Sequence, residues 1–127
     1  LSDFYVPDQG SVYGDDPNPA VNEFNKKYKA ATGGDPSSQY VYPGYVMIDV
    51  WAKAVERAKT TDADAVVKEL EKMKDEKTLF GPRTFTDKIH HQNRGRYLIT
   101  EVKNGKPGVV DEWTISEPIP VEYLVKK

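Results

Sequence analysis

One stretch, from Gln39 to Lys59, constrains the fold more than any other part of the sequence. Its residue spacing predicts a helix that has Pro43 in its first turn and apolar side chains around nearly its whole circumference. These side chains are Tyr42, Tyr45, Val46, Met47, Ile48, Val50, Trp51, Ala52, Ala54, Val55 and Ala58. A helix that is apolar on every side is normally buried. We therefore expect this helix to be central to the core, with Ile48 and Trp51 covered.

A shorter, amphipathic helix is predicted before the apolar one. Asn18 can cap it with a side-chain oxygen, Pro19 suits its first helical position, and Gly33-Gly34 should end it. We expect Asn25 to lie with the lysines of this helix on its solvated side.

A third helix is predicted to begin at Thr61 or Asp62, where Thr61 and Asp64 approximate a capping box. Its apolar stripe consists of Ala63, Val66, Val67, Leu70 and Met73. We expect residues 74–77 to carry this helix to an exposed end.

Strands are predicted near both ends of the sequence. Residues 1–6 are β-prone and should form a strand at a sheet edge, or one leading into the sheet, that Pro7 stops. The β-like runs 97–103 and 109–115 are typical of a hairpin, with residues 104–108 as a five-residue connection.

The size and charge of the chain exclude several classes of function. Its 127 residues suit a single domain. The chain has 18 basic and 20 acidic side chains. This balance gives no excess of positive charge for binding a nucleic acid or an anionic membrane. No apolar run approaches the ~20 residues that span a bilayer. Without cysteine, the chain has neither disulfides nor thiolate metal ligands.

No residues of the sequence combine into a recognisable catalytic or metal site. Adjacent His90 and His91 point apart in an extended chain, so we expect them to lie in a polar structural loop. The serines lack a nucleophile motif. Residues 33–38 suit the end of one helix and the start of the next better than a phosphate cradle. Paired acids such as Asp15 and Asp16 suit solvated faces. We therefore expect no enzyme activity, no metal and no cofactor.

Three tyrosines gather over residues 37–45, where a loop enters the apolar helix. A tyrosine ring carries a polar tip, and a helix N-terminus offers backbone donors to an anion. This combination suits a small ligand that bears a carboxylate. The other interpretation is that Tyr40, Tyr42 and Tyr45 pack in the core with their hydroxyl groups hydrogen-bonded.

Several short motifs occur in the order and spacing of one protein family. They are Asn-Pro-Ala-Val-Asn-Glu-Phe-Asn-Lys-Lys-Tyr-Lys-Ala (18–30), Gly-Asp-Pro-Ser-Ser (34–38), Gly-Tyr (44–45), Phe-Gly-Pro-x-Thr-Phe (80–85) and His-Gln (91–92). Over residues 1–117 the chain resembles the C-terminal third of the type I periplasmic binding proteins. Within these it is similar to the branched-chain amino acid (Leu/Ile/Val) class of ABC transporter substrate-binding proteins.

The resemblance implies an α/β fold. The chain would form part of a doubly wound lobe, with about three helices, a short N-terminal strand and a C-terminal β-hairpin. Residues 1–127 would be a single C-terminal portion of a substrate-binding protein. Within it, 1–95 would belong to the lobe, 96–117 would form the hairpin, and 118–127 would be an extended tail.

The resemblance also implies a ligand site and no catalytic or metal residue. In the family, an aromatic residue just before the long helix approaches the bound ligand. The matching position is Tyr40, and Tyr42 and Pro43 lie beside it. The family's Ser/Thr ligands for the amino-acid carboxylate, and its acidic partner for the amine, come from earlier parts of the chain that have no match here.

Two functions remain open. The first is a solute-binding component, as a fragment or shortened form, of a bacterial ABC importer for amino acids or related small carboxylates, aromatic ones included. It would act in the periplasm with a membrane permease as its partner. The alternative is a free-standing protein-interaction module that retains part of the fold without complete ligand binding. If the chain is complete as given, its apolar helix should leave a patch that drives homo-oligomerisation.

Overall fold

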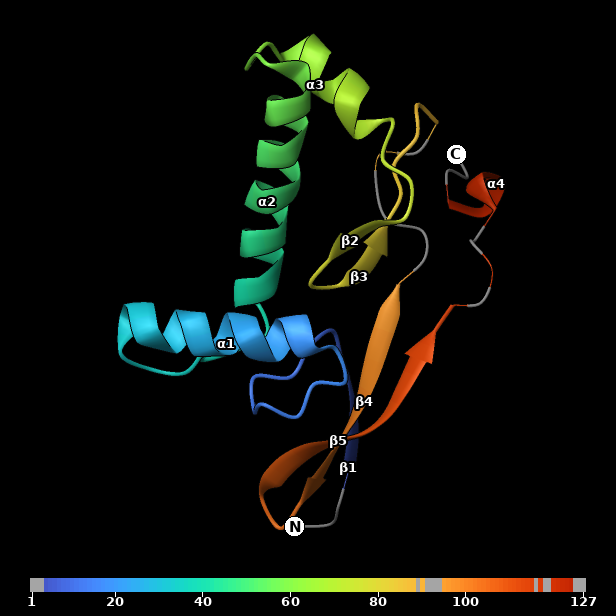
Figure 1. Ribbon diagram of the computed structural model, residues 1–127. Helices are drawn as coiled ribbons and strands as arrows, with labels where there is room; N and C mark the ends of the chain where they lie inside the picture. The colour runs from blue at the N-terminus through green and yellow to red at the C-terminus, as the bar shows by residue number, and fades with distance from the viewer. Residues whose placement is uncertain (1–3, 89, 91–94, 116, 118–119, 125–127) are drawn as a thin grey trace. The chain divides into compact units, whose positions relative to one another are not determined.

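The computed structural model describes residues 4–88, 90, 95–115, 117 and 120–124. Its elements follow one another as Figure 1 shows: β1 (Phe4–Asp8), α1 (Pro19–Thr32), α2 (Val41–Ala58), α3 (Ala63–Leu70), β2 (Glu76–Thr78), β3 (Gly81–Arg83), β4 (Arg96–Lys103), β5 (Lys106–Thr114) and α4 (Val121–Leu124). The mixed α/β content, with three longer helices and short antiparallel strands, agrees with the predicted fold class. None of the described helices is long and apolar enough to cross a membrane.

The chain divides into two compact units. Unit 1 contains Leu1–Pro43 and Arg96–Thr114, and unit 2 contains Gly44–Gly95 and Ile115–Lys127. The boundary near Pro43 falls within the first turn of α2.

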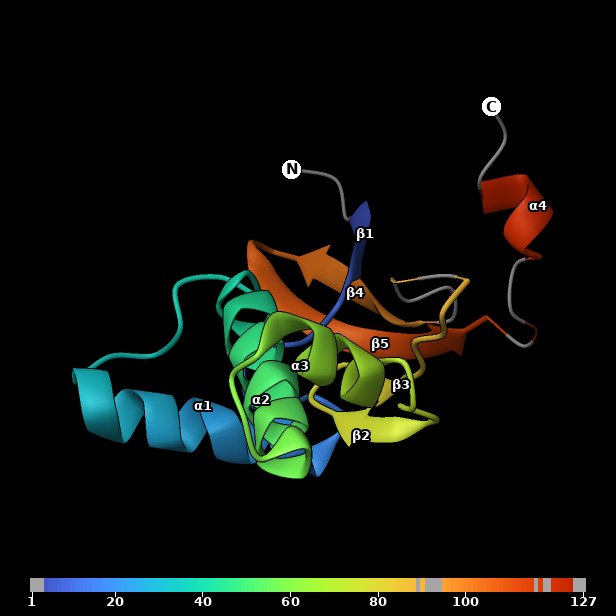
Figure 2. The ribbon, with the colours of Figure 1, turned by 90° about the horizontal axis from the view of Figure 1, so that it is seen from above.

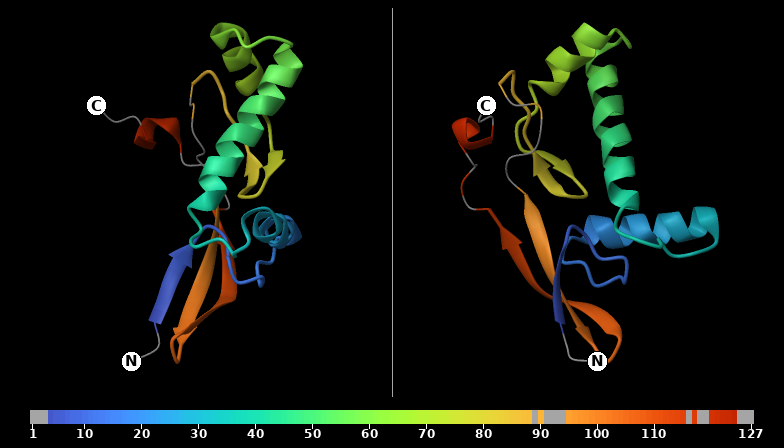
Figure 3. Two further views of the ribbon diagram at one scale, coloured as in Figure 1. Left: turned by 90° about the vertical axis from the view of Figure 1, so that its left-hand side faces the viewer. Right: turned by 180° about the vertical axis from the view of Figure 1, so that it is seen from behind.

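Unit 1 is built on a three-stranded antiparallel sheet in the order β1-β4-β5 (Figure 3). β1 lies at an edge, as one of the two expectations had it, but it continues through Pro7, which pairs with Ile99. The expectation that Pro7 ends the strand is therefore wrong. An edge strand tolerates proline because alternate backbone N–H positions point away from the neighbouring strand.

The β4–β5 hairpin is tighter than the sequence pattern indicated. Its turn consists of Asn104 and Gly105 alone, with φ angles of 51° and 74°, and β5 begins directly at Lys106. Two successive positive φ angles define a type I′ turn, for which Asn-Gly is the preferred sequence. The expected five-residue connection is thus wrong. A register shift between Ile99 and Thr100 marks a bulge in the hairpin.

α1 begins and ends where the sequence predicts. The Asn18 side chain accepts a hydrogen bond from the backbone N–H of Ala20 at 3.1 Å, and Gly33 ends the helix with a φ of 82°. Asn25 differs from expectation because it is buried together with Val21, whereas the lysines are exposed. Its amide is hydrogen-bonded inside unit 1, so its burial leaves no unsatisfied polar group.

Only one face of α2 is covered within the part of the chain that the structure describes. Val46, Val50 and Ala54, spaced four residues apart, are buried. Ile48 and Trp51 are 65% and 48% exposed, so the expectation that both are covered is wrong. The physical reason is that the described elements of unit 2 pack on the side of α2 that carries Val46 and Val50, and Ile48 and Trp51 lie on other sides of the helix.

The core of unit 2 forms where α2 meets α3 and the β2–β3 hairpin (Figure 2). Buried Val46, Val50 and Met73 contact the partly buried side chains of Leu70, Leu79, Phe80 and Phe85. The sequence did not predict the β2–β3 hairpin, which consists of two three-residue strands paired from Glu76–Arg83 to Thr78–Gly81. A strand of three residues is too short to show the alternation of apolar and polar side chains by which a strand is recognised in a sequence.

The ends of the third helix and of the chain also differ from expectation. Asp62 caps α3 by accepting from the backbone N–H of Ala65 at 3.0 Å, in place of the predicted capping box. α3 ends at Leu70, so residues 74–77 are not its last turn. The tail contains a helical turn, α4, whose Tyr123 N–H donates to the carbonyl of Pro120. Pro118 lies outside the described residues.

Candidate functional site

The three residues predicted to bind a ligand surround the start of α2 but differ sharply in exposure. Tyr40, directly before the helix, is 79% exposed. Tyr42 is 0% exposed, and Pro43 is half-buried. Tyr40 is thus the one of these three whose ring is open to a small molecule, whereas Tyr42 matches the core-packing interpretation of the tyrosines.

The loop before α2 uses its own backbone donors. The N–H of Tyr40 donates to Ser38 Oγ at 3.2 Å, and the N–H of Val41 donates to the Ser38 carbonyl at 3.3 Å. The N–H of Tyr42 donates to the Gln39 carbonyl at 3.0 Å. These three donors are therefore engaged, and a ligand carboxylate would have to find its donors elsewhere.

Tyr42 attaches the start of α2 to the interior of unit 1. Its hydroxyl lies 2.8 Å from both the Ser11 carbonyl and Asn25 Oδ1, two acceptors within reach of one proton. Its ring meets that of Phe24 edge-on, with centroids 5.6 Å apart. Gly10 leaves room for the ring, because a Cβ at this position would lie 2.8 Å from Tyr42 Cε2.

Asp16 fixes the backbone of the 9–18 loop, which contains Ser11, a hydrogen-bond partner of Tyr42. Its carboxylate accepts from the backbone N–H groups of Ser11 at 2.9 Å and Asn18 at 2.8 Å. Both of its oxygens also face the guanidinium of Arg96 on β4, at 2.9 and 3.2 Å. The expectation that Asp16 lies on a solvated face is wrong: its side chain is buried and fully hydrogen-bonded.

We call Ser11, Asp16, Asn25, Tyr42 and Arg96 the anchoring cluster. It joins the 9–18 loop, α1, the start of α2 and β4 through buried hydrogen bonds. A bidentate arginine–carboxylate pair is rigid and directional, so the cluster fixes the 9–18 loop, and through Tyr42 it holds the start of α2 against that loop. Arg96 carried no signal in the sequence, because its partner lies eighty positions earlier in the chain.

Asp15 connects the same loop to the bulge of β5. Its carboxylate accepts from the Ser11 hydroxyl and, at 2.8 Å, from the backbone N–H of Val109. Partial burial by itself would raise the pKa of Asp15. The hydrogen bonds from Ser11, Val109 and its own backbone outweigh that effect, and the pKa lies below its ordinary value of 3.8.

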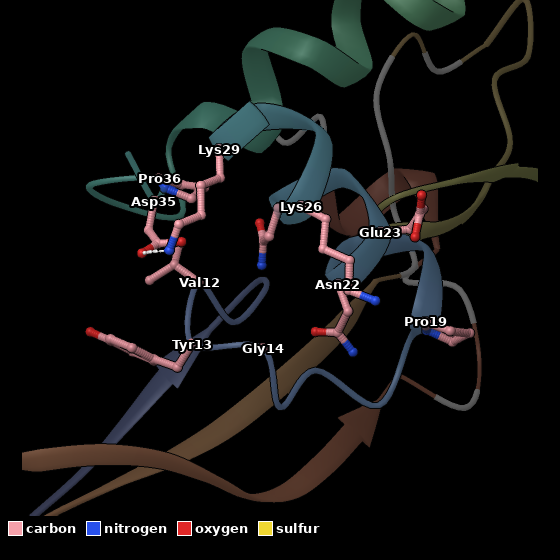
Figure 4. A pocket seen from close by; sticks show the side chains of 11 residues that line it. Val12, Tyr13, Gly14, Pro19, Asn22, Glu23, Lys26, Lys29, Asp35 and Pro36 are labelled. Atoms are coloured by element: carbon pink, nitrogen blue, oxygen red, sulfur yellow. Dashed lines mark hydrogen bonds and ion pairs between the residues drawn. The ribbon is translucent and has the colours of Figure 1, made fainter. Parts of the chain in front are cut away.

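Unit 1 also contains an open groove of about 930 Å³ beside α1 (Figure 4). The 12–14 loop, one side of α1 and residues 35–36 line it. An ion pair between Lys29 and Asp35, at 2.9 Å, lies along this groove. None of the three predicted ligand residues lines it, so the groove and the start of α2 are separate places on unit 1.

His90 lies in unit 2, where its Nε2 is 2.9 Å from Glu71 Oε1. Among the described residues, no group of three or more His, Asp or Glu side chains could hold a metal ion. His91, the other member of the predicted pair, lies outside the described residues.

Comparisons with known proteins show which family and which fold this chain is similar to. The sequence matches the periplasmic binding protein family over residues 1–107. Among solved structures, the leucine-binding protein LivK of Thermotoga maritima is similar over 86% of this chain, with a TM-score of 0.66 and 20% identity. The similarity covers 30% of the LivK chain. No curated protein matches the sequence. At this identity the LivK likeness shows a shared fold, of which the present chain contains a part.

Proposed function

The chain belongs to the periplasmic binding protein family, and from this premise we propose that it is part of the solute-binding component of a bacterial ABC importer. Its ligand would be an amino acid or a related small carboxylate with an apolar or aromatic side chain. Capture would be non-covalent, in the periplasm, and a membrane permease would receive the ligand. The likeness to LivK, a leucine-binding protein, supports this class of ligand.

The observation that carries the proposal is the presentation of Tyr40. A large aromatic side chain that is 79% exposed directly before a long helix has a ring that a ligand can reach. The loop that holds it is ordered by Ser38 on one side and by the Gln39 side chain, which accepts from the Gln9 N–H at 2.9 Å, on the other. Because these hydrogen bonds order the backbone that carries the ring, less conformational entropy is lost when a ligand packs against it.

The division of roles follows from burial and hydrogen bonding. Tyr40 would pack its ring against the apolar side chain of the ligand. Tyr42 and Pro43 would act beside it by holding the start of α2, since the Tyr42 hydroxyl is already engaged inside unit 1. The carboxylate and amine of the ligand would bind the portion of the family fold that has no counterpart here, because the local backbone donors are used.

The substitution Tyr40→Ala tests this role in the complete product of the gene that encodes the chain. We expect it to weaken ligand binding by about 1–3 kcal/mol, whereas Tyr40→Phe, which keeps the ring, should cost much less. Tyr13→Ala is the matched control, because Tyr13 is also an exposed loop tyrosine of unit 1. Calorimetric titration measures all three. Equal affinity of wild type and Tyr40→Ala would remove Tyr40 from the site.

The alternative, a free-standing protein-interaction module, is favoured by one observation. α2 exposes Met47, Ile48 and Trp51, large apolar side chains of the kind that protein partners cover. This function predicts a gene product that ends near the limits of the present chain and binds no amino acid. Two measurements therefore distinguish the two functions: the length of the gene product, and its titration with amino acids.

A further inference from the structure

The turn of the β4–β5 hairpin consists of an asparagine followed by a glycine (Figure 1). Asn104 and Gly105 are both exposed. The hydrogen bond that closes such a turn joins the residues on either side of it, Lys103 and Lys106, so it leaves the N–H of Gly105 unused. Within the described part of the chain, neither this N–H nor the Asn104 side-chain amide has a hydrogen-bond partner. Both groups are therefore free to react with each other.

An asparagine side chain and the backbone nitrogen that follows it are the reactants of an intramolecular deamidation. The Gly105 nitrogen loses its proton to water and attacks Cγ of Asn104. A C–N bond forms, the Cγ–Nδ2 bond breaks, and Nδ2 leaves as ammonia after taking up a proton. One water molecule then opens the cyclic succinimide. Opening at Cγ leaves aspartate, whereas opening at the backbone carbonyl leaves isoaspartate, in which the main chain runs through Cγ.

Asn104 is better placed for this reaction than the other described asparagines. Glycine has no Cβ to hinder the attacking nitrogen. Asn18 precedes Pro19, which has no N–H to deprotonate. Asn22 and Asn25 use both the oxygen and the nitrogen of their side-chain amides in hydrogen bonds. The structure therefore singles out one of these four asparagines.

Two lysines give the turn a positive charge. Lys103 and Lys106 face each other in the strand register, and both are exposed. Neither forms an ion pair with a described residue. Deprotonation of the Gly105 nitrogen and its attack on Cγ place negative charge at the turn, and nearby positive charge favours the anionic form of a group. The lysines should therefore speed the reaction.

We propose that Asn104 is a site of non-enzymatic deamidation, that Lys103 and Lys106 raise its rate, and that the isoaspartyl product disrupts the β4–β5 hairpin. The aspartyl product should keep the type I′ turn, because Asp-Gly is also a preferred sequence for it. The isoaspartyl product adds a carbon atom to the backbone, so the two-residue turn loses its register. That register places the Val109 N–H 2.8 Å from Asp15, and the modification would therefore also weaken the contact of the hairpin with the 9–18 loop.

The complete gene product, incubated folded at neutral and mildly alkaline pH, tests the site. Peptide mapping by mass spectrometry detects the gain of about 1 Da when a carboxylate replaces the amide. Methylation by protein isoaspartyl methyltransferase detects isoaspartate. Asn22 and Asn25 are internal controls. We expect Asn104 to deamidate about ten-fold faster than either, because its reacting groups are free and the next residue has no Cβ.

Two variants test the other parts of the proposal. The double variant Lys103→Gln/Lys106→Gln should deamidate about two-fold more slowly or less, both when folded and in urea, where the stability of the hairpin no longer affects the rate. Asn104→Asp has the charge of the deamidated protein but only the aspartyl linkage. The deamidated fraction, collected by ion exchange after ageing, should contain a species that unfolds at a lower temperature than Asn104→Asp.

Each part of the proposal has a result that would overturn it. Deamidation of Asn104 no faster than that of Asn22 and Asn25 in the folded product, or seen only in denaturant, would remove the site. A double lysine variant that reacts as fast as wild type in urea would overturn the role of the lysines. A deamidated fraction that unfolds at the same temperature as Asn104→Asp would overturn the effect on the hairpin. None of these results depends on the ligand of the proposed function.

Discussion

Single buried polar residues decide the local geometry of unit 1. Asn25 and Asp16 lie in polar stretches of the sequence, from which we expected solvent-exposed side chains. Both are buried, because each finds complementary donors and acceptors in the anchoring cluster. A buried polar group costs little when it is hydrogen-bonded and a great deal when it is not. The partners lie far away in the sequence, and the hydrogen bonds form only once the fold has brought them together.

Arg96→Met should destabilise the protein strongly because it leaves the Asp16 carboxylate buried beside an uncharged side chain. Breaking one side of a buried ion pair costs about 3–5 kcal/mol. The control is Arg57→Met, since Arg57 is half-exposed in its pairs with Glu69 and Glu76 and should cost about 1 kcal/mol or less. Urea unfolding measures both. Equal losses for the two variants would show that Asp16 does not depend on Arg96.

The lowered pKa of Asp15 predicts a pH dependence of stability with a definite sign. The folded state binds the proton of Asp15 less tightly than the unfolded state does, so the stabilisation is complete above the ordinary pKa of 3.8 and decreases as the pH falls below it. Asp15→Asn removes this contribution. The difference in unfolding free energy between wild type and Asp15→Asn should therefore shrink below about pH 4. A difference that stays constant through this range would contradict the assignment.

At the scale of elements, the β4–β5 hairpin depends on its two-residue turn. Asn104 and Gly105 both adopt positive φ, which fixes which residues of the two strands face each other. The register places Tyr97 opposite Trp113, whose rings lie 6.0 Å apart, and it also places Val109 where its N–H reaches Asp15.

Gly105→Ala should destabilise the hairpin by about 1–2 kcal/mol, because a Cβ disfavours the left-handed conformation at φ 74°. Gly34→Ala is the control, since that glycine has no positive φ and open space around it. Thermal unfolding followed by circular dichroism compares the two. A Gly105→Ala midpoint equal to that of Gly34→Ala would contradict the type I′ turn.

Elements with their own local signals could be predicted from the sequence, and those that depend on distant partners could not. Asn18 and Gly33 delimit α1 by capping chemistry that acts within four residues. The three-residue strands β2 and β3 have no comparable signal. The candidate site shows the same division: the family resemblance points to Tyr40, but the Asp16–Arg96 pair that fixes the 9–18 loop joins residues eighty positions apart.

At the scale of the whole molecule, the exposed apolar side chains of α2 dominate the expected behaviour of the isolated 127-residue chain. Without the remaining portion of the fold, Met47, Ile48 and Trp51 form an uncovered apolar surface. We expect this chain to associate into dimers or larger oligomers at micromolar concentration, and Ile48→Lys to reduce the association. Sedimentation tests this. A single folded species near 14.3 kDa would contradict it.

Calorimetric titration of the complete gene product with apolar and aromatic amino acids tests the central claim most directly. A solute-binding protein should give a saturable one-site isotherm with at least one of them, and no heat of binding with a neutral sugar used as a control. We predict that isotherm, and we predict that it weakens in Tyr40→Ala. A folded, monomeric product that binds none of these amino acids would contradict the proposed function.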